Sequence, residues 1–406
     1  MRIKPEDDVF APIARGVAQG GVRVANERAV LALIAGIPGV SNADIARMSG
    51  LGPQTTSRIL TDLETRELIL RGEVLRGRRG QPATPYRINP VGAFSIGAEI
   101  GWDHLELVLQ NFMGETLAVV RKPHGGPVTE TVLETIAAEA AALKATLPEG
   151  HRDRLAGIGI ASPLDFRALP GDGNIGAADP DAWSRIDIAG RVSAATGLAA
   201  IWASDGNAIT LAELVTQPFP RPSAIAAFFL GTYLAGGITG RSRLLDGARG
   251  LAAHPGATMV SGPQGKPVPL QALASLRALS QAVEAAGNTV PLRQSRDWNW
   301  DELAPHVEPW LESAAGALAQ AVLSTSAMTG IDYCVIDGDL PPEILTRLVD
   351  RTAQHLSRLP AHLPALPQVV AGTVGAKAAA LGVANMLVYQ QFFSRDWELF
   401  DALAAN

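Results

Sequence analysis

The stretch from Ser41 to Leu63 constrains the fold of this chain more than any other. Ser41 followed by Asp44 predicts the start of a helix, because a side-chain oxygen at the N-cap accepts hydrogen bonds from the free N–H groups of the first turn. Gly50-Leu51-Gly52 predicts a tight turn after that helix. Pro53 then suits the first position of a second helix, where its missing N–H costs nothing. The expected unit is a helix, a short glycine turn and a helix.

Polar side chains fill the first turns of the second helix, while Ile59, Leu60 and Leu63 recur at helical spacing and are expected to face inward. Amide, hydroxyl and guanidinium groups in these turns of a recognition helix can read base edges in the DNA major groove. The candidate DNA-contacting residues here are Gln54, Thr55, Thr56, Ser57 and Arg58. Two amphipathic helices joined by a glycine turn also occur in ordinary helical domains. DNA binding is therefore predicted only when the flanking segments are considered as well.

The flanking segments favour a winged helix-turn-helix. Residues 26–35 have the spacing of a preceding helix, Leu68-Ile69-Leu70 that of a strand, and residues 85–89 that of a return strand. The loop between the two strands is rich in arginines spaced by glycines, and such a loop can follow phosphates or enter a narrow minor groove. We therefore add three wing residues to the candidate DNA contacts, Arg76, Arg78 and Arg79.

Charge is distributed unevenly along the chain. The net charge of −6 alone argues against a nucleic-acid partner, but residues 1–90 contain 13 Arg and Lys against nine Asp and Glu, whereas the remainder contains 21 against 31. A basic head on an acidic body fits a DNA-binding module attached to a second unit. A length of 406 residues also predicts two or three domains. We place the boundary at Asn89-Pro90, with a winged helix-turn-helix DNA-binding domain over residues 1–89 and a sensor body over residues 90–406.

Three features bear on the compartment. Cys334 is the single cysteine, which excludes an internal disulfide and a cysteine-rich zinc site, and its apolar flanks predict an inert thiol in a buried strand. Residues 222–240 carry no charge, but glycines interrupt them, and a buried strand, a turn and a second strand explain them better than a membrane span. Charged residues between Arg2 and Asp8 argue against a signal peptide. We expect a cytoplasmic protein with no membrane partner.

Beyond the boundary the pattern becomes rich in strands. Three strands in hairpin order, a helix and a further strand are expected over residues 94–100, 105–110, 116–120, 130–146 and 155–160. A second set follows, with strands over residues 224–230, 235–239 and 333–336 and helices over residues 270–286 and 303–329. Two α/β lobes, each a mixed sheet with packed helices, would leave a cleft in which a small ligand can bind.

Several short segments in this order resemble the ROK family. They are Ser204-Asp205-Gly206-Asn207, the turn from Leu230 to Ile238 and the segment from Gly372 to Gly382. That family groups sugar-responsive transcriptional repressors with sugar kinases on an actin-like ATPase fold, and its regulators carry an N-terminal winged helix. The resemblance covers residues 27–384. It implies an α/β chain in which a winged helix-turn-helix precedes a two-lobed actin-like ATPase fold.

The two phosphate loops of the kinase members are altered in this sequence. Phosphate cradles need small residues, because backbone N–H groups must approach the phosphoryl oxygens closely. The first loop corresponds to residues 99–103, where Trp102 occupies a position that calls for a small side chain. The second corresponds to residues 231–237, where Tyr233 and Ala235 replace glycines. We therefore expect no ATP cofactor, no catalytic residues and no enzyme activity.

The resemblance also implies a sugar site that is partly retained. Asp205 matches the general base of the kinase members, and without ATP it can still accept a hydrogen bond from a hydroxyl; it can equally cap the following helix. Asn174 lies in a loop that the family places near the sugar. The family's Glu-x-Gly-His element and its zinc-binding cysteines are missing from residues 250–269, so we expect no metal site. His254, the nearest match there, either reaches the ligand or is an ordinary loop residue.

These observations predict a transcriptional regulator, and more specifically a repressor, that binds an operator in double-stranded DNA as a homodimer or homotetramer. A sugar or polyol in the cleft is the expected effector. Two alternatives stay open: a sugar kinase of the same family, which the altered phosphate loops disfavour, and a regulator that binds DNA without any effector. The apolar stretch from Pro309 to Met328 is either a dimer face or part of a lobe core.

Overall fold

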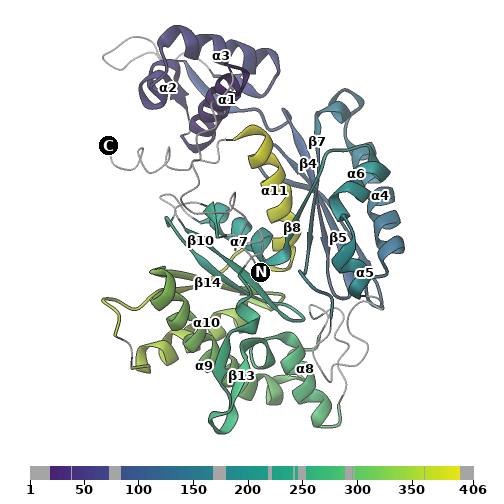
Figure 1. Ribbon diagram of the computed structural model, residues 1–406, viewed down its shortest axis with the longest axis vertical. Coiled ribbons are helices and arrows are strands. Elements are labelled where there is room, and N and C mark those ends of the chain that lie inside the picture. Colours follow the sequence, from purple (N-terminus) through teal and green to yellow (C-terminus); the bar gives the residue numbers. More distant parts are fainter. Residues whose placement is uncertain are drawn as a thin grey trace, which may run out of the picture.

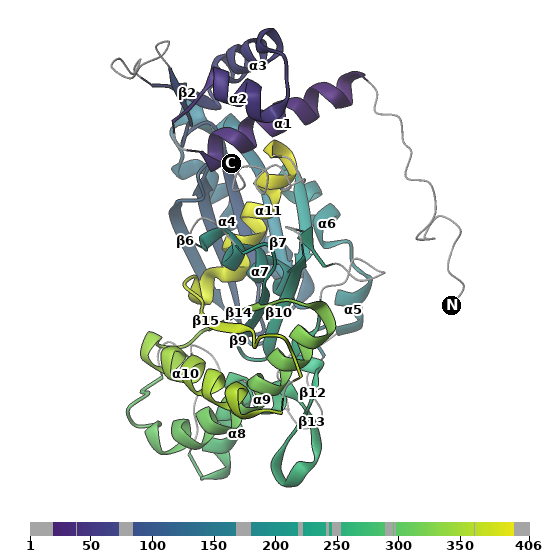
Figure 2. The same ribbon diagram turned by 90° about the vertical axis from the view of Figure 1, so that its left-hand side faces the viewer.

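A computed structural model describes most of the chain as three bodies stacked along one axis (Figures 1 and 2). The described residues are 19–37, 39–72, 84–167, 180–217, 222–240, 243–245, 253–288, 295, 298–360 and 362–393. A small head lies at one end, and two larger α/β lobes follow it. The predicted fold class, a winged helix-turn-helix followed by a two-lobed actin-like body, is confirmed.

The head contains three helices and a small sheet. The helices are α1 (Gln19–Gly36), α2 (Asn42–Ser49) and α3 (Pro53–Thr65), and the strands β1 (Val40–Ser41), β3 (Pro85–Ile88) and β2 (Ile69–Arg71) pair in that order. The Ser41 hydroxyl accepts a hydrogen bond from the Asp44 N–H, as the sequence predicts for a helix start. Gly50 ends α2 in the left-handed conformation, with φ of 68°, which favours glycine. The predicted helix, glycine turn and helix are therefore confirmed.

Lobe I is a five-stranded mixed sheet with helices on one face. Its strands are β4 (Phe94–Ile100), β5 (His104–Asn111), β6 (Thr116–Pro123), β7 (Leu155–Ser162) and β8 (Ala200–Ser204). They lie in the order β6-β5-β4-β7-β8, with the first three antiparallel and the last two parallel to β4. The helices α4 (Thr129–Thr146), α5 (Pro180–Arg185) and α6 (Ile188–Thr196) bury their apolar side chains against this sheet.

Lobe II repeats the plan. Its strands are β9 (Ala226–Leu230), β10 (Leu234–Gly240), β11 (Arg243–Leu244), β14 (Tyr333–Gly338) and β15 (Gln368–Ala371), in the order β11-β10-β9-β14-β15. The helices α8 (Leu276–Ala285), α9 (Ala304–Thr329) and α10 (Pro342–Arg358) share one core with this sheet, and a hairpin of β12 (Met259–Ser261) and β13 (Pro267–Pro269) extends from it.

The structure answers three smaller predictions about lobe II. Cys334 is fully buried in β14, as expected for a core thiol. Eleven side chains of α9 are buried, which favours the core interpretation of this helix over the dimer face. The helix expected from residue 270 starts only at Leu276, because the hydroxyl of Ser275 caps it through the Ala278 N–H. Within the described residues, none of the helices combines the length and apolar character needed to cross a membrane.

Two helices lie between the sheets. They are α7 (Asp205–Thr216) and α11 (Ala378–Phe392), and the core around them is built mainly from alanines. Small residues let the backbones approach closely: a Cβ at Gly382 of α11 would overlap the carbonyl oxygen of Ala208 in α7. A Cβ at Gly97 of β4 would likewise overlap the carbonyl oxygen of Ala380. These contacts fix α11 tightly against α7 and the sheet of lobe I.

The far end of α11 reaches the head (Figure 1). Val388 and Phe393 belong to the same hydrophobic cluster as the buried side chains of α1 and α3, and Phe112 of lobe I completes it. Arg154 of lobe I pairs with Glu67, and it donates a hydrogen bond of 3.0 Å to the carbonyl of Val91. The head therefore rests on lobe I through a shared apolar core and a polar clasp.

Candidate functional site

The first turns of α3 present polar side chains at the end of the molecule remote from the two lobes (Figure 1). Gln54, Ser57 and Arg58 are exposed, and Thr55 is half-buried. The expectation for Thr56 is wrong: its side chain is fully buried, and its hydroxyl donates to the carbonyl of Gly52 at 3.3 Å. A side chain turned into the head core cannot reach a base edge, so Thr56 leaves the set of candidate DNA contacts.

One polar neighbour of this surface escaped the sequence reasoning. The side-chain amide of Asn42, at the start of α2, donates to the hydroxyl of Ser57 at 2.9 Å. This bond joins the two helices of the unit at the exposed end of α3. Asn42 follows the predicted N-cap Ser41 directly, but its distance from Ser57 in the sequence gave no sign that the two side chains meet.

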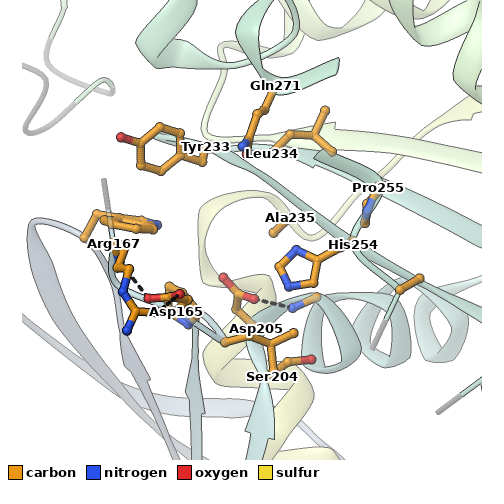
Figure 3. Close-up of a pocket in the computed structure, with 16 residues that line it drawn as sticks. Asp165, Arg167, Ser204, Asp205, Tyr233, Leu234, Ala235, His254, Pro255 and Gln271 are labelled. Carbon is orange, nitrogen blue, oxygen red and sulfur yellow. Dashed lines mark hydrogen bonds and ion pairs between the residues drawn. The ribbon is translucent and has the colours of Figure 1, made fainter. Parts of the chain in front are cut away.

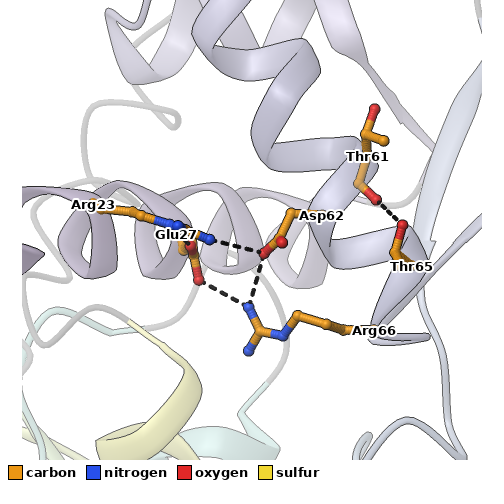
Figure 4. A network of polar contacts seen from close by, with 6 residues as sticks. All are labelled: Arg23, Glu27, Thr61, Asp62, Thr65 and Arg66. Carbon is orange, nitrogen blue, oxygen red and sulfur yellow. Dashed lines mark hydrogen bonds and ion pairs between the residues drawn. The ribbon is translucent and has the colours of Figure 1, made fainter.

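A network of charges holds α3 against α1 (Figure 4). Arg66 pairs with Glu27 at 2.9 Å and with Asp62 at 3.2 Å, and Arg23 pairs with the same two carboxylates at 2.9 and 3.6 Å. Exposed ion pairs of this kind contribute little to stability, because solvent and salt screen them. Their consequence for function is that Arg23 and Arg66 are already balanced, which leaves Arg58 as a cation of α3 available to a phosphate or a base.

The wing residues Arg76, Arg78 and Arg79 lie outside the described residues, so their DNA contacts stay a prediction. The base of the wing is described on both strands. Arg71 at the end of β2 pairs with Glu64 at 3.0 Å, and its guanidinium lies 5.7 Å from the ring centroid of Tyr86 on β3. The strands that carry the wing are therefore fixed to each other and to α3.

The cleft between the lobes contains a cavity of about 170 Å³ (Figure 3). Asp205 and His254, the two candidate ligand residues that are described, both line it. Asn174, the third, lies outside the described residues. The structure thus brings together two residues that are 49 positions apart in the sequence. The polar and aromatic side chains of the wall also include those of Trp102, Asp165, Arg167, Ser204, Tyr233 and Gln271.

Asp205 occupies the first turn of α7. Ser204 is the N-cap of this helix, since its hydroxyl accepts the Asn207 N–H at 3.2 Å, so the cap role that we considered for Asp205 falls to its neighbour. The Asp205 carboxylate accepts the Gly206 N–H at 2.7 Å and faces the cavity. Burial raises the pKa of Asp205 to about 7, the hydrogen bond from Gly206 opposes this, and the nearby Glu99 adds to it. A perturbed carboxyl in a cleft is typical of a functional site.

Aromatic rings meet where the phosphate loops of a kinase would face each other. Trp102, between β4 and β5, contacts Tyr233, between β9 and β10, edge to face with centroids 4.6 Å apart. Trp102 also contacts Phe166 at 5.5 Å, and Phe166 contacts Trp183 at 5.1 Å. A row of four rings therefore runs from lobe II into lobe I past these two loops.

The second loop is also tied down through its backbone. The carbonyls of Gly231 and Thr232 accept the N–H groups of Leu276 and Arg277 at 3.0 and 3.1 Å. These N–H groups belong to the first turn of α8, where a helix would otherwise offer them to an anion. The N-terminus of α8 is therefore occupied by the chain itself.

A second, smaller cavity of about 60 Å³ lies behind the Trp102 ring. Its wall includes His104, whose ring lies 2.6 Å from Asp103 and 3.8 Å from Glu99. Burial lowers the pKa of His104, but the hydrogen bond with Asp103 and the negative charge of the nearby Glu99 outweigh it and raise this pKa to about 9. Burial would raise the pKa of Asp103, yet the bond to His104 leaves that pKa below its ordinary value. Protonated His104 thus provides a positive charge beside the carboxylates of Asp103 and Glu99.

Several lining residues were missed from the sequence. Asp165 and Arg167 follow directly on β7, and the carboxyl ends of sheet strands are where α/β proteins bind ligands, so their position was the available signal. Gln271 comes from the turn before α8 and gave no signal. Across the described residues, no three His, Cys, Asp or Glu side chains are arranged to hold a metal ion.

Known proteins share this architecture. A sequence profile of the ROK family matches residues 95–390. The uncharacterized protein y4fQ of Sinorhizobium fredii is 26% identical over 379 residues, which span 91% of this chain and 92% of that protein. The solved structure of a ROK family transcriptional regulator, a homologue of the Escherichia coli MLC protein, matches 95% of this chain and 100% of its own with a TM-score of 0.69 at 20% identity.

Sugar kinases match the same architecture over a smaller part. A ROK glucokinase from Streptomyces griseus, in complex with glucose and AMPPNP, covers 72% of this chain and 99% of its own with a TM-score of 0.58 at 19% identity. A ROK hexokinase from Thermus thermophilus covers 73% and 98% with a TM-score of 0.53 at 24% identity. At such identities both regulator and kinases indicate the fold alone, whereas the sequence profile covers more than half of the chain. The chain therefore belongs to the ROK family.

Proposed function

We propose that this protein is a cytoplasmic transcriptional regulator whose head binds operator DNA and whose cleft binds a sugar or polyol. In this proposal residues 1–89 form the DNA-binding domain, residues 90–406 form the sensor, and two heads of a homodimer read a pseudo-palindromic site. The body performs no phosphoryl transfer. The structural match to a ROK transcriptional regulator over 95% of the chain is consistent with this division.

The observation that carries the proposal is the exposed polar end of α3. Gln54, Ser57 and Arg58 point into solvent from the second helix of a helix-turn-helix, at the end of the molecule that the lobes leave free. An amide and a guanidinium in this place can read purine edges, and a hydroxyl can bind a phosphate or a base. The rest of α3 is held by its apolar side, with Ile59, Leu60 and Leu63 in the head core.

The cleft supports a sensor more than a kinase. Trp102 and Tyr233 fill the phosphate region, and the first turn of α8 is bonded to the second loop. A sugar hydroxyl can nevertheless bind the Asp205 carboxylate in the neighbouring cavity.

A route from the cleft to the head exists in α11. The N–H of Gly375, just before this helix, donates to Asp337 at 2.6 Å, and the other end of the helix lies in the head core. An effector can shift the head arrangement by this route only if it binds the two lobe arrangements with different affinity.

DNA binding is tested with purified protein and selected genomic fragments. We expect Gln54→Ala to relax sequence preference, because it removes a base-reading amide, and Arg58→Ala to weaken binding by about 1 to 3 kcal/mol. The double variant Arg78→Ala with Arg79→Ala should weaken binding to all sequences and flatten its salt dependence. Arg358→Ala, an exposed arginine on α10 of lobe II, serves as the matched control.

Electrophoretic mobility shifts at two salt concentrations provide the measurement. Equal binding by wild type and all three head variants would remove the DNA half of the proposal. ATP turnover with hexoses measured on the same sample separates the kinase alternative, and we expect none. Operator binding that ignores every sugar tried would instead favour the regulator without an effector.

A further inference from the structure

We propose that the cavity around Asp205 selects an effector that carries a protonated amine on a hydroxylated, sugar-like frame, and that it rejects phosphorylated sugars. This inference rests on the proposed sensor function and names the chemistry of its ligand. It depends on three observations: the surplus of carboxylates in the cleft, the lack of a basic partner for one of them, and the aromatic rings beside it.

Carboxylates outnumber basic groups on the walls of the two neighbouring cavities. The acidic residues are Glu99, Asp103, Asp165, Asp205 and Asp339, and the basic residues are His104, Arg121, Arg167 and His254. Two of these basic groups are paired within the set, His104 with Asp103 at 2.6 Å and Arg167 with Asp165 at 2.6 Å. Arg121 is directed to Glu106 at 3.2 Å, a residue outside the cavity walls. The described part of the cleft is therefore negative.

Asp205 is the carboxylate that this pairing leaves without a cation. Its hydrogen-bond donor is the N–H of Gly206, and among the described residues no lysine, arginine or histidine forms an ion pair with it. One oxygen of the nearby Glu99 is buried and has no hydrogen-bond donor in the described structure. A protonated amine placed in the cavity would supply both a charge and up to three donors to this region.

The rings of Trp102 and Tyr233 line the same cavity as Asp205. Figure 3 labels Tyr233 and Asp205 on its wall. An ammonium group near an aromatic face is attracted by the negative face of the ring, and the C–H faces of a sugar ring also pack well on an indole. The aromatic wall and the carboxylate thus favour the same ligand, one with an apolar sugar face and a positive substituent.

The same walls disfavour a phosphate. A phosphate would add about two negative charges to a cleft that already has a surplus. The N–H groups that could neutralise it at the start of α8 are bonded to Gly231 and Thr232. Arg167, a cation of the larger cavity, is shared between Asp165 and Asp181. A phosphorylated sugar therefore meets no unpaired arginine or lysine among the described residues of the cleft, and His254 is left as a basic side chain outside an ion pair.

The test compares three forms of each hexose on the full-length protein: the parent sugar, its amino-deoxy derivative and its phosphate. Glucose, galactose and mannose supply the parents, and the derivatives carry the amine or phosphate at C6 or the amine at C2. Isothermal calorimetry and tryptophan fluorescence report binding, the latter through Trp102. We expect at least one amino-deoxy sugar to bind tenfold or more tightly than its parent, and no phosphate to bind as well as its parent.

Two variants assign the preference to its source. Asp205→Asn should reduce the ratio between amino sugar and parent sugar to about one, while Glu302→Gln, which changes an exposed acid of lobe II, should leave the ratio unchanged. Thermal unfolding confirms that each variant is folded, and Tyr233→Leu provides a second variant that should lower the ratio by removing one ring.

The outcomes are distinct. A parent or phosphorylated sugar that binds as tightly as its amino form overturns the inference and leaves the sensor function standing. If none of the sugars binds, both the inference and the sugar-sensing half of the proposed function fail, whereas the DNA measurement still decides the other half.

Discussion

Two buried acids, one on α7 and one on β14, interact with each other. Glu213 of α7 is fully buried and Asp337 of β14 is 2% exposed. Asp337 accepts the N–H groups of Gly338 and Gly375 at 2.8 and 2.6 Å. Burial, and then the hydrogen bond and repulsion from Asp337, raise the pKa of Glu213 to about 9. Glu213 therefore acts as the protonated partner of the pair near neutral pH.

The pair predicts a pH-dependent stability. Because the pKa of Glu213 is raised on folding, its contribution is fully present below about pH 4.5 and is lost as the pH rises towards 9. Glu213→Gln keeps a donor towards Asp337 but does not titrate. We expect the free energy of unfolding of this variant, relative to wild type, to rise between pH 5.5 and pH 8.5, by at most about 1.4 kcal/mol per pH unit.

Urea unfolding at pH 5.5, 7 and 8.5 measures this difference. Glu302→Gln, at an exposed acid, is the control and should show none. A difference between Glu213→Gln and wild type that stays constant over this range would mean that Glu213 is ionised in the folded protein.

At the scale of single residues, the sequence predicts the charge and size of a side chain better than it predicts which way the side chain points. It identifies Trp102 and Tyr233 as too large for a phosphate loop, and the two rings do meet in the cleft. It fails at Thr56, because a threonine between Thr55 and Ser57 is as polar as its neighbours and only helix packing decides which of them faces the core. Asp165 and Arg167 are missed for a related reason: their position after β7 is a signal, but only the folded chain shows that their side chains reach the cavity.

At the scale of elements, α11 shows how close packing limits substitution. Gly382 lets this helix contact the backbone of α7, where a Cβ would overlap the carbonyl oxygen of Ala208. Gly316 in α9 offers a matched comparison, since a Cβ there would meet only the ring of His355, at 3.8 Å. Both glycines lie inside helices, so their intrinsic helix propensities are the same.

The two substitutions to alanine are expected to change the stability of the protein in opposite directions. Gly382→Ala should destabilise the protein by about 3 kcal/mol or more, because backbone cannot move aside as a flexible side chain can. Gly316→Ala should stabilise it by about 0.5 to 1 kcal/mol, since alanine loses less conformational freedom in a helix. Denaturant unfolding measures both, and a mild effect of Gly382→Ala would show that α11 is packed more loosely against α7.

Elements with strong periodicity are predicted well by the sequence. The strand expected over residues 94–100 is β4, and the helix expected over residues 303–329 differs from α9 by one residue at its start. The start of α8 is predicted six residues early, because Leu270, Leu273 and Leu276 continue an apolar pattern through a turn that Ser275 ends. The spacing of apolar residues indicates which side chains are buried, whereas the N-cap residue indicates where the helix begins.

At the scale of the molecule, the head and lobe I share one hydrophobic core. Phe112 at the end of the β5 hairpin packs its ring against Phe392 and Phe393, with centroids 4.8 and 5.6 Å apart. These rings belong to the cluster that contains the buried side chains of α1 and α3. We expect a head joined in this way to move with lobe I, which is the motion that the proposed coupling of effector and DNA requires.

This shared core predicts that head and body unfold together and that one residue can separate them. Phe112→Ala removes a ring that the head core shares with lobe I, which should cost about 3 to 5 kcal/mol, while the separate core between the sheet of lobe I and α4 is left intact. Differential scanning calorimetry should show one transition for wild type and an additional, lower transition for the variant. Met113→Ala, at the neighbouring 59% exposed residue, should retain the single transition.

The lower transition should coincide with the loss of operator binding on heating, because the head unfolds in it. A single transition in Phe112→Ala, merely shifted in temperature, would show that the polar clasp of Arg154 with Glu67 and Val91 suffices to couple the two units.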